Sequence, residues 1–253
     1  MYILLTIAYD GSIYAGWQRQ ENAITIQEKL EDALSTLIKR PIQVKGASRT
    51  DAGVHAMGQR ASFFAPDLLI PLNKLPMVLN GILPSDISVT DAIEVDESFN
   101  PRFDAKHKTY NYNIYNATYP NPLQARYSTF IPHNLKLPDM QKAAQQFIGR
   151  HDFSAFCATG SNAKTTIREI YSCDIEIKDD GNKKGENSNL ISISITGNAF
   201  LYNMVRIIAG TIVYVGLGKI SHDEIGDIIK SNDRTQAGKT MPPQGLILMD
   251  VCY

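Results

Sequence analysis

A short glycine-rich segment holds the densest group of side chains that could do chemistry. Residues 46–59 read GASRTDAGVHAMGQ and place Arg49, Asp51 and His55 among three glycines. Glycine lets a backbone approach a ligand closely and adopt positive φ. A carboxylate in such a loop can act as a nucleophile or as a base, and Arg49 could bind a phosphate or replace a displaced base. The alternative is structural, because Asp and Gly are also the usual residues of turns.

Arg206 is unusual because it is the only charged residue between Asn198 and Gly218. The apolar spacing of this stretch predicts a mostly buried helix over 199–215. A buried guanidinium needs a partner, and a carboxylate such as Asp51 would suit it in bidentate geometry. The alternative is an arginine whose stem packs while its head reaches solvent.

Tyr110 belongs to a strictly alternating segment, KTYNYNIYN, at 108–116. The alternation predicts a strand with Tyr110 on its apolar face. The residue is either a packed strand tyrosine or a ring that stacks on a base, with a hydroxyl that handles a proton.

Other kinds of site are not supported. His151, Asp152 and Ser154 do not make a hydrolase triad, since neighbouring residues rarely aim at one another and no GxSxG elbow exists. Gly216 and Gly218 lack the third glycine of a dinucleotide fingerprint. Neither CxxC nor HxxxH spacing occurs, so we expect no metal. The three cysteines lie far apart, which favours a reducing cytoplasm over a disulfide framework.

Helices and strands that could position these residues alternate along the chain. We predict helices over 25–38, 71–81, 138–149 and 199–215, with Thr25 and Glu28 as a capping box for the first. A further short helix is capped by Ser221 and Glu224. Strands are predicted over 2–9, 58–65, 87–95, 108–116, 170–178, 189–197 and 245–253, with a polar hairpin tip at 179–188.

Several of these strands follow one another directly, which favours an α+β fold with largely antiparallel sheets. The chain has 253 residues, enough for one or two domains. A weak boundary near 98–106 predicts an N-terminal α+β domain over 1–105 with the Asp51 loop, and a C-terminal α+β domain over 106–253 that completes the site. No apolar run of the ~18 residues that a membrane span needs is present, and the N-terminus resembles a strand rather than a signal peptide.

The net charge of −1 carries no global signal for nucleic acid. Charge is nevertheless uneven: residues 39–60 hold five basic residues and one acid, and residues 100–126 hold four basic residues and one acid, with tyrosines interleaved. Basic residues with aromatic rings suit phosphate contacts and base stacking. The alternative is a solvated sheet edge with core tyrosines.

Six segments, in order, resemble motifs of the tRNA pseudouridine synthase A family. They are YDGSIYAGWQRQ (9–20), GASRTDAGVHAMGQ (46–59), KTYNYNIY (108–115), GRHDFSAF (149–156), AFLYNMVRIIAG (199–210) and PPQGLIL (242–248). The resemblance implies two α+β domains whose sheets join across a central RNA-binding cleft, with helices on the sheets, in a homodimer. It also implies isomerisation of uridine to pseudouridine at tRNA positions 38 to 40, without cofactor or metal.

The resemblance also implies roles for five residues. By motif position, Asp51 matches the catalytic aspartate, Tyr110 the active-site tyrosine, Arg206 the arginine that pairs with the aspartate, Arg49 the arginine that holds the target base out of the stem, and Leu246 a residue of the pocket lining. The departures, Ser48 for Gly, Asn100-Pro101 for His-Ala and Met241 for Ala, leave these residues in place.

Two other functions compete with this one. A non-catalytic RNA-binding or RNA-folding module could keep the scaffold, but its mark would be the loss of Asp51. A nucleotide-dependent enzyme would need a phosphate loop, and the sequence has none. For the synthase itself, three first steps stay open: attack of Asp51 on the ribose, attack on the base, or proton abstraction.

Overall fold

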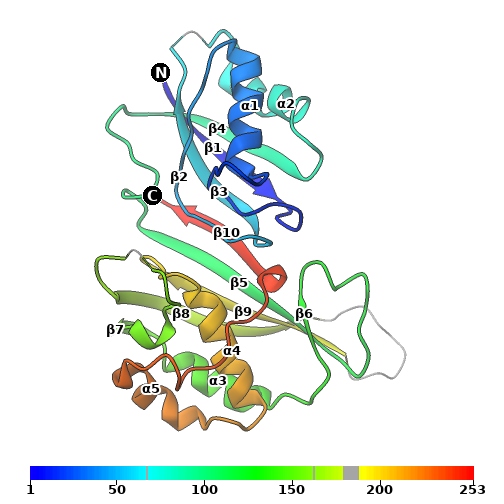
Figure 1. Cartoon of the computed structure of the whole chain (residues 1–253), viewed down its shortest axis with the longest axis vertical. Helices are drawn as coiled ribbons and strands as arrows, with labels where there is room; N and C mark the ends of the chain where they lie inside the picture. The colour runs from blue at the N-terminus through cyan, green and yellow to red at the C-terminus, as the bar shows by residue number, and fades with distance from the viewer. Residues whose placement is uncertain (67, 162, 179–187) are drawn as a thin grey trace. The chain divides into compact units, whose positions relative to one another are not determined.

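The computed structural model describes residues 1–66, 68–161, 163–178 and 188–253 (Figure 1). The chain forms two compact units. Unit 1 is Met1–Lys106 with Ile247–Tyr253, and unit 2 is His107–Leu246. The sequence predicts 106–253 as one C-terminal domain, whereas the structure groups the last seven residues with unit 1. The reason is strand pairing, because β10 (Leu246–Cys252) pairs with a strand of unit 1.

Unit 1 contains a sheet in the order β4-β1-β3-β10. The central strands β1 (Tyr2–Tyr9) and β3 (His55–Phe64) are antiparallel, as are β1 and β4 (Ile87–Val95). The last strand, β10, runs parallel to β3, and the two-residue β2 (Lys45–Gly46) also pairs with β3. This sheet places the end of β1 beside the start of β3, and the segment that carries Asp51 leads directly into β3 at this point.

Two helices pack on one side of this sheet (Figure 1). Helix α1 (Ile26–Ile38) begins where the Thr25 hydroxyl oxygen accepts a hydrogen bond from the Glu28 N–H at 3.3 Å, and it ends at the left-handed residue Lys39. Its face of Ile26, Leu30 and Leu34 is fully buried. Burial of each such side chain contributes about 1.5–3 kcal/mol. The second helix, α2 (Leu75–Asn80), follows the 3-10 turn η1 (Leu72–Lys74).

Unit 2 contains a sheet in the order β5-β9-β8-β7. Its strands β5 (His107–Asn116), β9 (Asn189–Gly197), β8 (Ile167–Lys178) and β7 (Gly149–Asp152) are antiparallel to their neighbours. A short strand, β6 (Thr129–Ile131), pairs in parallel with the end of β5. The mixed α+β class with mostly antiparallel strands, predicted from the sequence, is confirmed. Residues 179–187 of the predicted hairpin tip at 179–188 lie outside the described residues.

Three helices belong to unit 2 among the described residues: α3 (Leu137–Gln145), α4 (Met204–Gly216) and α5 (Ile225–Ser231). Short 3-10 turns stand at η2 (Ser154–Phe156), η3 (His222–Glu224) and η4 (Pro243–Gly245). The capping box of Ser221 and Glu224 is present as predicted. No helix in the described ranges is both long and apolar enough to cross a membrane.

Two helix boundaries differ from the prediction. The helix expected over 138–149 ends at Gln145, because Gly149 adopts a φ of +113° and begins β7. The helix expected over 199–215 begins only at Met204, because Asn203 is left-handed with φ 59° and ψ 8°. Helix α4 is buried on nearly every side, and it lies so close to residues 237–241 that a Cβ on Gly210 would overlap the carbonyl oxygen of Lys239.

Candidate active site

The predicted site residues fall into two groups, one in each unit. Arg49 and Asp51 belong to unit 1, and Tyr110, Arg206 and Leu246 belong to unit 2. Around each group, the hydrogen bonds show which parts of the fold hold it.

The Asp51 loop, defined as Ala47–Val54, connects β2 to β3. The Ala47 N–H donates to the Arg60 carbonyl at 2.8 Å. The fully buried Gln59 side chain accepts from the Ser48 N–H at 3.2 Å and donates to the Ser48 carbonyl at 2.7 Å. Both bonds use the backbone of Ser48, so a glycine at this position would make them equally well.

Thr50, which precedes Asp51, is held from two sides. Its hydroxyl lies 2.7 Å from that of Tyr9, and its carbonyl accepts from the Trp17 N–H at 3.0 Å. Gly16, at φ +93°, allows this approach, since a Cβ there would lie 2.5 Å from the Thr50 carbonyl oxygen. Because these contacts are buried, the backbone entering Asp51 is firmly placed.

Asp51 itself is half-buried, and Arg49 is exposed. The Asp51 carbonyl accepts from the Val54 N–H at 3.1 Å, which closes a turn. The backbone of this segment therefore forms a turn, as the structural alternative for Asp51 and its glycines predicts.

Trp17 packs inside unit 1, close to the start of the Asp51 loop. It is 2% exposed, and its ring is tilted against that of Tyr9 at 6.2 Å. A Cβ on Gly46 would come within 2.6 Å of its Cε2 atom. The indole therefore supports β2 just before the Asp51 loop.

A polar network on α1 holds the segment that carries Trp17. The Gln27 amide accepts from the Arg19 N–H and the Gln18 side chain, each at 3.0 Å, and donates to the Val44 carbonyl at 3.0 Å. It also donates to the Glu31 carboxylate at 3.0 Å. Glu31 accepts in turn from Arg19 Nη1 at 2.9 Å and from the Val44 N–H at 3.1 Å. One pair of side chains thus joins α1 to both neighbouring segments.

His55, the remaining polar residue of the glycine-rich motif, is buried at the start of β3. Its Nδ1 atom lies 3.2 Å from the Asp10 carboxylate and accepts from the Gly11 N–H at 3.1 Å. These contacts join the turn after β1 to the strand that leaves the Asp51 loop. His55 therefore has a structural position in unit 1.

In unit 2, Tyr110 is a packed strand tyrosine. It is 6% exposed on β5, and its ring stands edge-on to Phe200, with centroids 5.2 Å apart and planes at 84°. Phe200 precedes α4, so this contact joins the strand that carries Tyr110 to the segment that leads to Arg206. Packing fixes the ring, and it does not by itself exclude a role in stacking on a base.

Arg206 is held by two acceptors from different parts of unit 2. Its Nε donates to the Met241 carbonyl at 2.7 Å, and its Nη1 donates to Asn203 Oδ1 at 2.6 Å. The residue is half-buried, and the Met241 N–H donates back to the Arg206 carbonyl at 3.2 Å. These contacts favour the prediction of a partnered arginine. We call Arg206, Asn203 and Met241 the Arg206 clamp.

The segment after Met241 is itself anchored to β5. The Tyr112 hydroxyl bonds Thr129 Oγ1 at 2.6 Å and donates to the Pro242 carbonyl at 2.8 Å. Burial raises the pKa of Tyr112 above its ordinary value, although the Thr129 bond and the charge of Arg206 act in the opposite direction. The phenol therefore stays neutral and acts as a structural tie.

Leu246, the fifth predicted residue, is buried at the start of β10. Gly245 before it lies against Tyr112, since a Cβ would meet the Tyr112 Cζ at 2.7 Å. The close packing of Gly245 against Tyr112 of β5 thus fixes the position at which β10 begins with Leu246.

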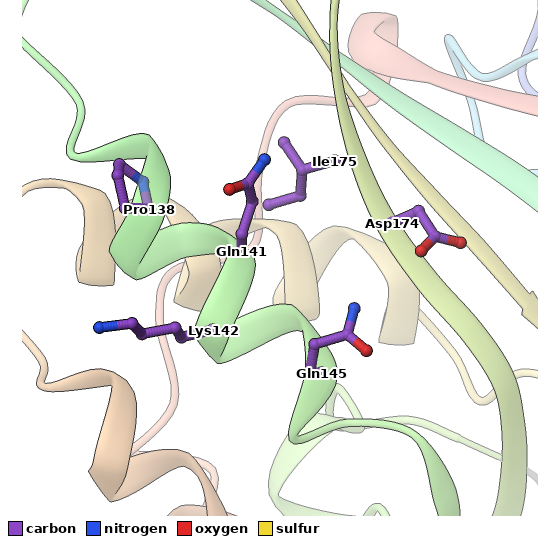
Figure 2. Close-up of a pocket in the computed structure, with 6 residues that line it drawn as sticks. All are labelled: Pro138, Gln141, Lys142, Gln145, Asp174 and Ile175. Atoms are coloured by element: carbon purple, nitrogen blue, oxygen red, sulfur yellow. The ribbon is translucent and has the colours of Figure 1, made fainter.

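Surface hollows occur away from these residues. One of them, with a volume of about 450 Å³, lies between α3 and β8 (Figure 2) and is lined by Pro138, Gln141, Lys142, Gln145, Asp174 and Ile175. A second, of about 980 Å³, lies in unit 1 beside Gln27 and Glu31. Neither is lined by a predicted site residue. Across the described ranges, no three His, Cys, Asp or Glu side chains gather as a metal site would require.

Two supporting residues were not predicted from the sequence, Gln59 and Asn203. Gln59 carries no clear signal, because it stands beside Arg60 in a strand of mixed polarity. Asn203 carries none either, because its contact with Arg206 depends on a left-handed backbone that the apolar pattern does not reveal.

Comparison with known proteins establishes the class. A sequence model of the family described as tRNA pseudouridine synthase matches residues 5–104 and 143–253, so the chain belongs to that family. Among similar proteins, the tRNA pseudouridine synthase A of Ruminiclostridium cellulolyticum is 48% identical over 251 residues, covering 99% of each chain. The proteins of the same name from Thermoanaerobacter sp. (strain X514) and Geotalea uraniireducens are 47% and 46% identical over the same length and coverage.

Proposed function

We propose that this chain isomerises uridine to pseudouridine in tRNA, at positions 38 to 40 of the anticodon stem-loop, with Asp51 as its catalytic residue. The observation that carries the proposal is the Asp51 loop. A half-buried carboxylate follows a threonine that Tyr9 and Trp17 hold from both sides. The relatives of nearly full length support the choice of reaction, since their printed names are those of tRNA pseudouridine synthase A.

The reaction breaks the N1–C1′ bond, turns the uracil and joins C5 to C1′; the hydrogen on C5 leaves as a proton, and N1, now free of the ribose, gains one. It is an isomerisation without net oxidation or reduction, so a carboxylate and a proton route suffice for the chemistry. Asp51 would begin it by attack on the ribose, attack on the base, or proton abstraction. Arg206 would stabilise the charged form of Asp51, and Tyr110 would stack on the uracil and help move a proton.

A paired base must leave its stack before an enzyme can act on it. The exposed Arg49 is the proposed group that holds the target base out, and Leu246 would line the pocket. Replacing Arg49 with alanine is expected to slow reaction at stem uridines more than at unpaired loop uridines. Equal losses at both would remove this role.

We also propose a cytoplasmic homodimer whose basic segments 39–60 and 100–126 contact tRNA phosphates. RNA is recognised largely through shape and backbone, so affinity should fall steeply with salt. A salt-independent affinity, or a monomer by light scattering at working concentration, contradicts this part of the proposal.

The test of the reaction uses tRNA carrying tritium at uracil C5, with a chelator present and no cofactor added. Wild type should release tritium to water, and Asp51→Asn should bind tRNA without release. Asp91→Asn, which changes an exposed aspartate on β4, is the matched control and should retain the wild-type rate. Tight binding without release by wild type would favour a non-catalytic RNA-binding module. Release by Asp51→Asn at the wild-type rate would remove Asp51 from the mechanism.

A further inference from the structure

Asn203 departs from ordinary helix-capping behaviour in two ways. A residue at the N-cap of a helix usually has extended backbone angles, and its side chain accepts from an N–H of the first turn. Asn203 instead has φ 59° and ψ 8°, and its side chain caps no backbone group. Its Oδ1 atom accepts from Arg206 Nη1 at 2.6 Å. The side chain of Asn203 thus contacts Arg206 and does not cap the helix.

That contact contributes to the placement of the guanidinium. The group is planar, so acceptors on two of its nitrogens determine the orientation of the plane. Met241 supplies one acceptor from its backbone, which the return bond to the Arg206 carbonyl holds in place. Asn203 supplies the other from its side chain. Of the two, only the Asn203 contact can be removed by substitution.

Few residues could replace Asn203 in both respects. Glycine takes the left-handed conformation freely, and asparagine and aspartate tolerate it, whereas most residues are strained there. Glycine has no side-chain oxygen to reach Arg206, so only asparagine and aspartate could meet both requirements. A non-glycine residue kept at positive φ beside a functional side chain points to a role in the site rather than in the helix.

We propose that Asn203 is a positioning residue that orients Arg206 for its role in uridine isomerisation. The inference rests on the proposed function, because it assumes that Arg206 acts in catalysis. Asn203 would not touch the uridine. Its loss should therefore slow the chemical step and leave tRNA binding unchanged.

The first variant is Asn203→Gly, which keeps the backbone conformation and removes the oxygen. A matched control exists in Asn232, which is also left-handed, with φ 54°, at the end of α5. Its Oδ1 accepts from the Ser154 hydroxyl at 2.7 Å, so Asn232→Gly removes an equivalent side chain. In the tritium-release assay we expect Asn203→Gly to lower kcat about 10-fold with KM unchanged, as supporting contacts at active sites commonly do. Asn232→Gly should stay within about twofold of wild type.

A double-mutant cycle with Arg206→Lys separates positioning from a general loss of structure. Lysine has no Nη1 to meet Asn203. If Asn203 acts through Arg206, adding Asn203→Gly to Arg206→Lys should slow single-turnover release no further. Rate losses that multiply, a changed KM at constant kcat, or a wild-type rate for Asn203→Gly would each overturn the inference. Absence of release by wild type would instead refute the proposed function.

Discussion

Replacing Glu31 with alanine is expected to lower the unfolding free energy of unit 1 by about 3–5 kcal/mol. Glu31 lies on α1 with its side chain 8% exposed. Its carboxylate accepts from three donors: the Val44 N–H, the Gln27 amide and Arg19 Nη1. Alanine removes the acceptor and leaves every donor in place.

The magnitude follows from where these donors lie. The bond to the Val44 N–H is buried and that to Gln27 is partly buried, and a buried donor that loses its acceptor costs about 1–3 kcal/mol. The Arg19 side chain is 50% exposed and can turn to water, so its share is at most about 1 kcal/mol. Together these contributions span about 2–7 kcal/mol, and the expected 3–5 kcal/mol lies in the middle of that range.

Urea unfolding followed by fluorescence measures this directly, because Trp17 is the only tryptophan of the chain and Gln27 bonds to the segment beside it. At a slope of about 2.5 kcal/mol per molar, the midpoint should fall by about 1–2 M. Glu28→Ala is the matched control on the same helix. Glu28 lies 4.0 Å from Arg19, and its side chain is 26% exposed, so its removal should cost less than about 1 kcal/mol.

The reasoning is refuted if Glu31→Ala loses no more stability than Glu28→Ala. That result would mean that solvent reaches the network and satisfies its donors. A large loss of unfolding free energy with an unchanged rate of tritium release per folded molecule would show that the network affects stability alone. A slower rate per folded molecule would connect it to the Asp51 loop through Trp17.

Three further results are expected. Gly46→Ala should cost about 1–3 kcal/mol and shift the Trp17 emission, because the new methyl group enters the space of the indole. Gly210→Ala should destabilise unit 2 by a similar free energy, because the carbonyl of Lys239 occupies the space of the new methyl group, and calorimetry should show a lower melting temperature. In an exposed helix the same change stabilises by about 1 kcal/mol. Hydrogen bonds lower the pKa of Asp152 below its ordinary 3.8, so its contribution is present above that pH and is lost as pH falls. Asp152→Asn should therefore lower the free energy of unfolding at neutral pH and make it fall less steeply below about pH 4. An acid-unfolding curve identical to that of wild type would contradict this.

Much of the fold could be predicted because its signals are local. Helix α1 has its cap at Thr25 and its apolar stripe within fourteen residues, and β5 shows its buried face by strict alternation. The short strands β2 and β6 were missed, because two or three residues carry no periodicity and only a tertiary partner makes them strands. The end of α3 was missed because Phe147 continues the apolar pattern past the last helical residue and is buried anyway.

In the candidate site, too, some residues could be predicted from the local sequence and others could not. Asp51 and Arg206 could be singled out because each is a charged residue in an unusual local setting, among glycines or within an apolar helix. The groups that hold them could not be predicted. The Met241 carbonyl and the hydroxyl of Tyr9 lie far along the chain from the residues they fix, and a backbone carbonyl has no signature in the sequence.

The return of β10 to unit 1 has a consequence for how the protein is made. Unit 1 is discontinuous, and all of unit 2 is translated between β4 and the strand that pairs with β3. A ribosome will therefore have released most of unit 2 before unit 1 can acquire its last strand. The edge of β3 at His55 gains this partner only after unit 2 has been synthesised, so the segment that leads from Asp51 into β3 is completed after unit 2 rather than with the rest of unit 1.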